Sequence, residues 1–240
     1  MYHSITFSNI ANTESKNTWD DWRLIPKTRP VFAPPEMKTH YVELPGGDGI
    51  IDLSTLLTDR PTFNNREGNI EFYVDTDYKP WYEIYSEITN YLHGQKVRAA
   101  LEDEPNYYYE GRFTIDEWAS EEQRSIIKFA YNVYPYKFST RSSMDDWIWD
   151  TFNFNTDIAA SYGSIRVDGS VALTILGSNM PVIPTINASD SGMSIVYSGT
   201  EYTLEKGSNR LGSIVISGGQ NEVTLKGNGT ISIDFRWGKL

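Results

Sequence analysis

The chain has 240 residues, of which 39% are hydrophobic and 22% are charged, and its formal net charge is −11. It contains no cysteine, which excludes thiolate nucleophiles, disulfide frameworks and cysteine-based zinc sites. The acidic balance argues against adhesion to nucleic-acid phosphates, because such binding depends on Lys and Arg. A chain of this length hides roughly 70% of its unfolded surface on folding, so it needs no metal or disulfide to be stable.

Aromatic residues make up 14% of the chain, with 16 tyrosines and 7 tryptophans. Aromatic side chains favour pleated, half-buried surfaces, and Tyr and Trp are enriched at protein interfaces. Residues 1–17 lack the basic and apolar regions of a secretion signal. No apolar run approaches the ~18 residues of a membrane helix. We therefore expect a soluble, β-rich protein that does not insert into membranes.

The first predicted domain, residues 1–138, is a β-sandwich with one attached helix. Its strands are expected where apolar and polar residues alternate, or where a short apolar run lies between turn residues. These segments are residues 3–10, 37–44, 69–74, 95–103, 107–118 and 124–136. The sequence PGGDG at residues 45–49 is a turn signal.

The helix is predicted over residues 78–94. Apolar residues recur there at three- and four-residue spacing and form one face, namely Trp81, Tyr85, Ile88 and Leu92. Pro80 suits the first turn and Gly94 suits the C-terminal end. His93 is then interpreted as part of the helix end and not as a metal ligand.

The second predicted domain, residues 139–240, is a galectin-like or jelly-roll β-sandwich. Its strands are expected at residues 164–176, 192–204, 212–225 and 226–237. Asp-Gly, Ser-Gly, Gly-Gly and Asn-Gly dipeptides predict turns between and within these segments. Residues 139–156 are the expected linker and first strand.

Catalytic and cofactor motifs are missing from the sequence. His3, His40 and His93 are dispersed, so no metal site is expected. The acids that neighbour each other in the chain are Asp20–Asp21, Glu102–Glu104, Glu121–Glu122 and Asp145–Asp146. Neighbouring residues in a strand point to opposite faces, so we interpret these acids as solvated turns and edges. We predict no enzyme activity and no cofactor.

Two tryptophan-rich segments remain as candidate sites. In NTWDDWRLIP, at residues 17–26, the candidates for scaffold or interface are Trp19, Asp21, Trp22 and Arg23. One tryptophan is expected to fill the core and the other to meet a neighbour. Asp20 or Asp21 is expected to order the turn or to pair with an arginine such as Arg23. In DDWIWD, Trp147 and Trp149 share one face if the segment is a strand. Their two rings could then form a stacking platform for a saccharide, or they could pack at a domain junction.

Several longer strings carry a family resemblance when they are taken together. They are NTWDDWRLIPKTRPVFAPPEMKTHYVELPGGDGIIDLS, RPTFNNREGNIEFYV, YLHGQKVRAALEDEPNYYYEGRF and VYPYKF in the first domain, and LKGNGTISIDFRWGKL at the end. In this order they resemble the distal tail protein (Dit) family of long-tailed phages and of related prophages. The first-domain strings cover most of residues 1–138.

The resemblance implies a structural role in the virion. A Dit-like N-terminal belt domain implies a hexameric ring at the distal end of a non-contractile tail. Such a ring joins the major tail tube protein to the tail-associated hub or lysin protein and to receptor-binding proteins of the baseplate or tail tip. DNA passes the lumen without specific binding. This places the mature protein in the virion after synthesis in the host bacterial cytoplasm.

Two other functions stay open from the residues alone. In the alternative hypothesis, the second domain is a carbohydrate-binding module that attaches the particle to host cell-wall saccharides. Its short loops leave little room for a dedicated pocket. A small glycosidase built on two carboxylates about 5–10 Å apart is the third hypothesis.

Overall fold

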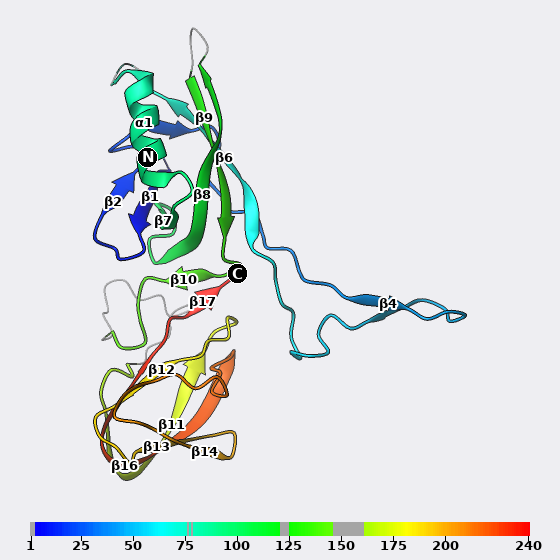
Figure 1. Cartoon of the computed structure of the whole chain (residues 1–240), viewed down its shortest axis with the longest axis vertical. Helices are drawn as coiled ribbons and strands as arrows, with labels where there is room; N and C mark the ends of the chain where they lie inside the picture. The colour runs from blue at the N-terminus through cyan, green and yellow to red at the C-terminus, as the bar shows by residue number, and fades with distance from the viewer. Residues whose placement is uncertain (1–2, 76, 78, 121–124, 146–160) are drawn as a thin grey trace. The chain divides into compact units, whose positions relative to one another are not determined.

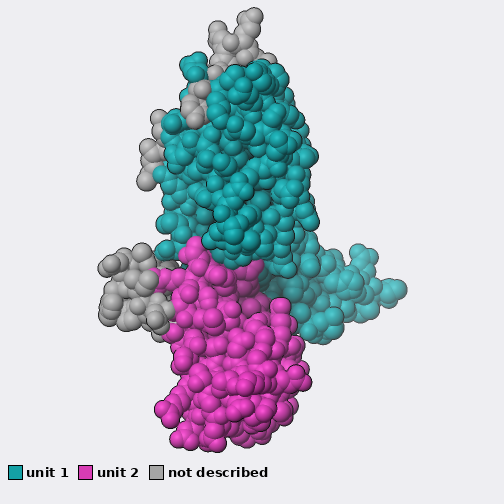
Figure 2. Space-filling view, turned by 60° about the vertical axis from the view of Figure 1, so that its left-hand side comes forward, with its two compact units in different colours: residues 1–137, 240 teal, residues 138–239 magenta. Residues whose placement is uncertain are grey.

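The computed structural model describes residues 3–75, 77, 79–120, 125–145 and 161–240. It divides into two compact units, residues 1–137 with Leu240, and residues 138–239 (Figure 2). Strands dominate both units, and α1 (Trp81–Leu92) is the helix of the described chain (Figure 1). The prediction of a mainly β protein with one helix is confirmed.

The first unit is built on one antiparallel sheet with strand order β2-β1-β7-β8-β9-β6-β3. Its strands are β1 (Ile5–Asn9), β2 (Ser15–Asn17), β3 (Leu24–Pro26), β6 (Arg66–Val74), β7 (Lys96–Leu101), β8 (Tyr107–Ser120) and β9 (Ser125–Val133). In β7, Val97, Ala99 and Leu101 are buried while the residues between them face outward. The predicted alternation therefore points these side chains to the core.

This sheet curls around a single core. Phe7 on β1 and Phe129 on β9 are separated by two strands in the sheet order, which in a flat sheet corresponds to about 14 Å. Their ring centroids lie only 6.2 Å apart. The sheet therefore curves so that β1 and β9 bring their inward-facing rings together in one aromatic cluster.

Helix α1 covers part of that core through Ile84, Ile88 and Leu92, which are all buried. The predicted apolar face is correct for Ile88 and Leu92. It is wrong for Trp81, which is 44% exposed, because Ile84 takes the core position one turn before Ile88. The helix begins after Pro80 and ends at His93, and Gly94 follows with a φ of 73°, as predicted for the helix ends.

Residues 36–64 leave the sheet as an extended arm (Figure 1). The arm holds a two-stranded hairpin of β4 (Tyr41–Glu43) and β5 (Ile50–Asp52), joined through the predicted turn at residues 45–49. The strand expected at residues 37–44 is thus reduced to three residues, and its partner β5 was not predicted. No strand of the main sheet pairs with β4 or β5 in the described part of the chain.

The second unit holds a sheet of order β14-β13-β16-β12-β15, with β11 paired to β16. Its elements are β11 (Ile165–Gly177), β12 (Thr185–Ala188), β13 (Ser194–Tyr197), β14 (Thr200–Thr203), β15 (Gly207–Asn209) and β16 (Gly219–Asp234). The short strands β10 (Lys137–Ser139) and β17 (Gly238–Lys239) complete the chain. The core is aliphatic, with Ile186, Leu225, Ile231 and Ile233 among the buried residues.

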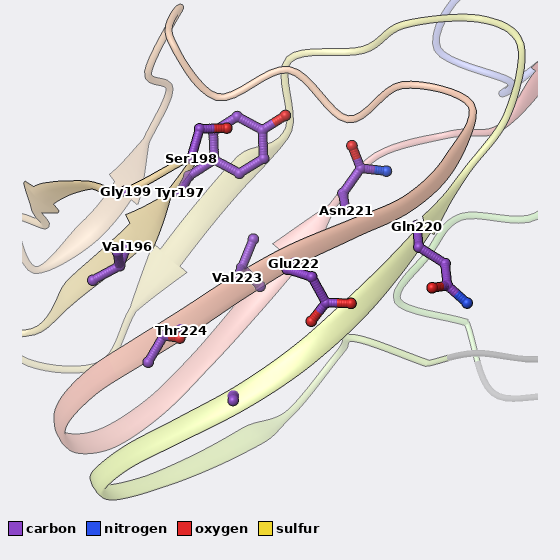
Figure 3. A pocket seen from close by; sticks show the side chains of 10 residues that line it. Val196, Tyr197, Ser198, Gly199, Gln220, Asn221, Glu222, Val223 and Thr224 are labelled. Atoms are coloured by element: carbon purple, nitrogen blue, oxygen red, sulfur yellow. The ribbon is translucent and has the colours of Figure 1, made fainter.

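Two predicted turns of this unit are interior positions of long strands instead. Asp168 pairs with Asn228, and Gly169 pairs with Gly227, inside the continuous β11–β16 ladder. Gly169 and Gly227 have φ values of 78° and 110°, a conformation that glycine adopts without a Cβ clash. Both strands fold back sharply while they remain paired (Figure 3). The chain changes direction at these glycine-containing dipeptides, as predicted. The two strands nevertheless stay paired through the bend, which was not predicted.

Candidate functional site: the interaction surfaces

The turn between β2 and β3 holds the first set of sequence-predicted residues. The Asp21 carboxylate accepts the backbone N–H of Asn17 at 2.7 Å and lies 3.3 Å from the Lys16 ammonium. Asp21 therefore orders this turn, as expected for an aspartate that bonds a nearby backbone group. The guanidinium of Arg23 lies 4.8 Å from the centre of the Trp19 ring, within the range of a cation–π contact.

The two tryptophans of this turn lie in different environments. Trp22 is 1% exposed, and its ring lies 6.3 Å from Phe7 and 5.8 Å from Tyr91. Trp19 is only partly buried. The structure thus brings Trp22 into the core and leaves the Trp19–Arg23 pair at the surface.

A buried arginine fixes the root of the arm. Arg66 donates to the carbonyl oxygens of Pro135 at 2.8 Å and Ala33 at 2.9 Å. The backbone N–H of Ala33 donates in turn to the Tyr131 hydroxyl at 2.8 Å. Burial lowers the pKa of Arg66, and burial raises the pKa of the adjacent Tyr109 to about 12. The hydrogen bonds of Arg66 and Tyr131 thus hold in place the segment that leads into the arm.

The arm carries most of the exposed apolar surface of the first unit. These residues are Met37, Tyr41, Leu44, Ile50, Ile51, Leu56 and Leu57. Leu57 is 96% exposed. An isolated two-stranded hairpin is marginally stable in water, and clustered apolar surface of this kind marks a site of interaction. The arm therefore has the character of a segment that is covered in an assembly.

A second aromatic surface, here called the helix-start patch, consists of Trp81, Tyr82, Tyr85 and Trp118. The Trp81 and Trp118 ring centroids lie 5.8 Å apart, and those of Tyr85 and Trp118 lie 5.1 Å apart. Tyr82 is 56% exposed. Within the described residues, the indole N–H of Trp118 is a buried donor with no hydrogen-bond partner. Buried polar groups without partners are uncommon in folded proteins, so this one calls for an explanation.

The acidic run at residues 102–104 forms ion pairs. The Asp103 carboxylate lies 2.8 Å from the Arg29 Nε and 3.0 Å from the His3 Nδ1. The hydrogen bond from Arg29 lowers the pKa of Asp103. His93, at the end of α1, accepts the backbone N–H of Ile115 at 3.0 Å through its Nδ1. These groups stabilise local structure.

The second unit has a polar hollow of about 400 Å³ on β16 and its neighbours (Figure 3). Gln220, Glu222 and Thr224 alternate along β16 with the buried Asn221 and Val223. Tyr197 lines the same hollow and donates its hydroxyl to the carbonyl of Val215 at 2.6 Å. Such a lining of amide, carboxylate and hydroxyl groups can hold a small polar ligand.

The predicted stacking residues Trp147 and Trp149 lie outside the described residues. In the described part of the chain, no group of three or more His, Asp or Glu residues is placed to hold a metal ion. No helix there combines the length and the apolar character that a membrane span needs.

Comparison with known proteins identifies the fold. No known family model matches the sequence, and no curated protein matches it. Among solved structures, the chain is similar to the crystal structure of the SPP1 Dit protein (gp 19.1), a paradigm of the hub adsorption apparatus in phages that infect Gram-positive bacteria. The TM-score is 0.60 over 98% of this chain and 99% of that chain, with 14% sequence identity. The chain has the fold of a Dit protein.

The Dit-like fold contains two surfaces that sequence reasoning missed. Apolar residues in the arm resemble the interior of a strand, since Ile50 and Ile51 or Leu56 and Leu57 are also what a buried segment contains. The usable signal was the position of these residues between the PGGDG turn at residues 45–49 and Pro61, since glycine and proline favour turns and loops. The helix-start patch was missed because Trp81 and Tyr85 share helical spacing with the core residues Ile88 and Leu92.

Proposed function

We propose that this chain is a distal tail protein, the structural hub at the end of a long non-contractile phage tail. The observation that carries this proposal is the likeness to the SPP1 Dit protein over nearly the full length of both chains. A match that spans both units supports the whole two-unit architecture and not only one common β-fold. The family-like strings in residues 17–138 support the same assignment independently.

In this proposal the protein acts by assembly and not by catalysis. Identical copies close into a ring through two different surfaces on each copy, as ring closure requires. The exposed apolar arm supports such an assembly. The ring, a hexamer as in the family that the sequence resembles, joins the tail tube protein to the tail-associated hub or lysin protein and to receptor-binding proteins in the virion.

Acidic surface suits a ring through which DNA passes. Residues 1–140 hold 22 acids and 14 bases, a net charge of −8. A channel wall of this sign repels phosphates, so that DNA moves without being held. We therefore place part of this charge at the lumen. An electrostatic map of an assembled ring tests this assignment, and a lumen lined by Lys and Arg would contradict it.

Electron microscopy of purified particles tests the proposed function. A fusion tag on this protein, decorated with a labelled binder, is expected to give density at the distal end of the tail, in a ring coaxial with the tube. A matched tag on the tail tube protein should label the whole tail length. Label on the capsid, or a single copy at the side of the tail, would overturn the proposal.

The polar hollow on β16 supports a second role, saccharide binding, which is compatible with the first. Glu222, Gln220 and Thr224 offer carboxylate, amide and hydroxyl groups on the outward face of β16, where they line this hollow. Binding of purified cell-wall polysaccharide to the wild-type chain is expected, with loss in a Gln220→Ala, Glu222→Ala variant. Equal binding by the variant and the wild type would place any saccharide site elsewhere.

A further inference from the structure

We infer that the helix-start patch binds a proline-rich segment of a partner protein in the extended polyproline II conformation. This inference goes beyond the proposed hub and does not depend on it. Its starting point is the Trp118 indole N–H, a buried donor that has no acceptor within the described residues. A buried donor without a partner lowers the stability of the free chain. A ligand that brings an acceptor to this position removes that cost.

The exposed rings of the patch offer apolar surface to the same ligand. Trp81 is 44% exposed and Tyr82 is 56% exposed. Their ring centroids lie 6.3 Å apart, and the ring planes cross at 85°. The two rings therefore present differently oriented faces at neighbouring positions, and exposed aromatic residues of this kind are the usual anchors of protein interfaces.

The position of Trp118 allows its N–H to be reached when a ligand binds. Trp118 packs against the core of the first unit, so its ring is held in place. Trp81 lies over it at a centroid distance of 5.8 Å but is the first residue of α1 and is partly exposed. Exposed side chains change rotamer rapidly. Rotation of Trp81 would therefore open the N–H while Trp118 stays fixed.

A polyproline II segment fits these requirements better than other ligands. Its backbone carbonyls make no internal hydrogen bonds, and proline has no backbone N–H. Such a segment gives Trp118 an acceptor and brings no donor that the aromatic rings would leave unpaired. A helix uses its carbonyls internally, and a saccharide brings several hydroxyl donors. Aromatic surfaces of other domains bind proline-rich segments in this conformation.

The charges near the patch predict basic residues in the bound segment. Helix α1 contains Glu83 and Glu87 and neither Lys nor Arg. Glu87 is paired with Lys79, which leaves the negative charge of Glu83 in the first turn in excess. Residues 1–140 as a whole carry a net charge of −8. We therefore expect Lys or Arg beside the prolines, and weaker binding at higher salt because exposed charges are screened.

Titration of the full chain with a synthetic peptide of two lysines followed by eight prolines tests the inference. The NMR signals of the tryptophan indole N–H groups report binding, and the Trp118→Phe variant identifies the signal of Trp118. This signal is expected to move to lower field at peptide concentrations up to about 1 mM, as its proton bonds to a carbonyl oxygen. A peptide with glycine at each proline position keeps the charge and should bind about tenfold more weakly, because a flexible chain loses more freedom on binding.

Variants of the chain make the test specific, with the affinity measured by fluorescence anisotropy of a labelled peptide. Trp81→Ala is expected to lower the affinity by about tenfold, as for an interface anchor. Trp118→Phe removes the donor and keeps an aromatic ring, so the affinity should fall by about fivefold while the melting temperature stays the same or rises. A residue with only a structural role would not separate these two readouts. Tyr134→Ala, which changes an exposed tyrosine outside the patch, should leave the affinity unchanged.

Several results would overturn the inference and leave the proposed hub in place. They are a Trp118 signal that does not move at the highest peptide concentration, equal binding of the proline and glycine peptides, and an unchanged affinity in Trp81→Ala. If only cell-wall polysaccharide moved the Trp118 signal, the patch would be a saccharide site. If the signal moved with protein concentration alone, the patch would bind a second copy of the chain.

Discussion

The Arg66 guanidinium donates a hydrogen bond to the backbone carbonyl of Ala33 at 2.9 Å, from a side chain that is only 5% exposed. Ala33 precedes the arm and Arg66 follows it at the start of β6. This hydrogen bond therefore joins the segment before the arm to the segment after it. Closure of a loop costs conformational entropy that this fixed, charge-assisted contact helps to offset.

Replacement of Arg66 by methionine should destabilise the first unit by about 3 kcal/mol, because two buried carbonyl oxygens lose a charged donor. Urea unfolding followed by tryptophan fluorescence measures the change. Arg210→Met, at an exposed position of the second unit, is the matched control and should have little effect. Equal unfolding midpoints for the two variants would show that the hydrogen bonds of Arg66 contribute nothing to the free energy of unfolding.

The two tryptophans of the turn at residues 18–23 should respond differently to truncation. Trp22→Ala removes a fully buried ring and is expected to cost about 3–5 kcal/mol of unfolding free energy. Trp19→Ala removes a partly exposed ring and is expected to cost at most about 1 kcal/mol. Chemical denaturation of both variants measures the difference. Similar costs for the two, or an unchanged Trp22→Ala protein, would contradict the assignment of Trp22 to the core.

Alkaline stability should depend on Tyr109. Burial raises the pKa of this tyrosine from 10.0 to about 12, so between these values the folded chain keeps a proton that the unfolded chain releases. The stabilisation is complete below pH 10 and is lost as the pH rises through 12. Tyr109→Phe should therefore flatten the fall of the melting temperature in this window. Tyr82→Phe, at an exposed position, should keep the wild-type slope. If the melting temperature of Tyr109→Phe fell with pH as steeply as that of the wild type, another group would control the loss of stability at high pH.

The sharp bend of the β11–β16 ladder should be sensitive to a side chain at Gly169. Its φ of 78° lies in the left-handed region, and alanine there should cost about 1 kcal/mol. Asparagine tolerates this region better, so Gly169→Asn should cost less. Gly212→Ala, where an added Cβ meets open space, is the control for the loss of glycine itself. If Gly169→Ala and Gly212→Ala melted at the same temperature, the bend would not depend on glycine at this position.

Local patterns in the sequence predicted the elements well where one face of a strand meets the core. The alternation of Val97, Ala99 and Leu101 in β7 is set by burial along a single strand, and the structure confirms it. The helix ends at Pro80 and Gly94 were also correct, because they depend on backbone preferences of single residues.

Other assignments failed because they depend on contacts between distant segments. Trp81 and Ile84 both fit an amphipathic helix, and the position of α1 on the sheet decides that Ile84 is buried. Asp168–Gly169 and Asn228–Gly229 fit turns equally well, but register places Asp168 opposite Asn228 within one ladder. Local patterns make the arm resemble a buried strand, because the residues near Leu57 in the chain do not show that Leu57 is 96% exposed.

The sequence by itself determined the mainly β class, the single helix, the lack of cysteine chemistry and the acidic charge, because composition and short-range periodicity are properties of the chain alone. Only the tertiary structure decided that the sheet curls to bring Phe7 to Phe129, that Trp22 and not Trp19 is buried, and that the arm and the helix-start patch remain exposed. Each of these depends on which distant residues meet in space, and that is settled by the packing of the whole unit.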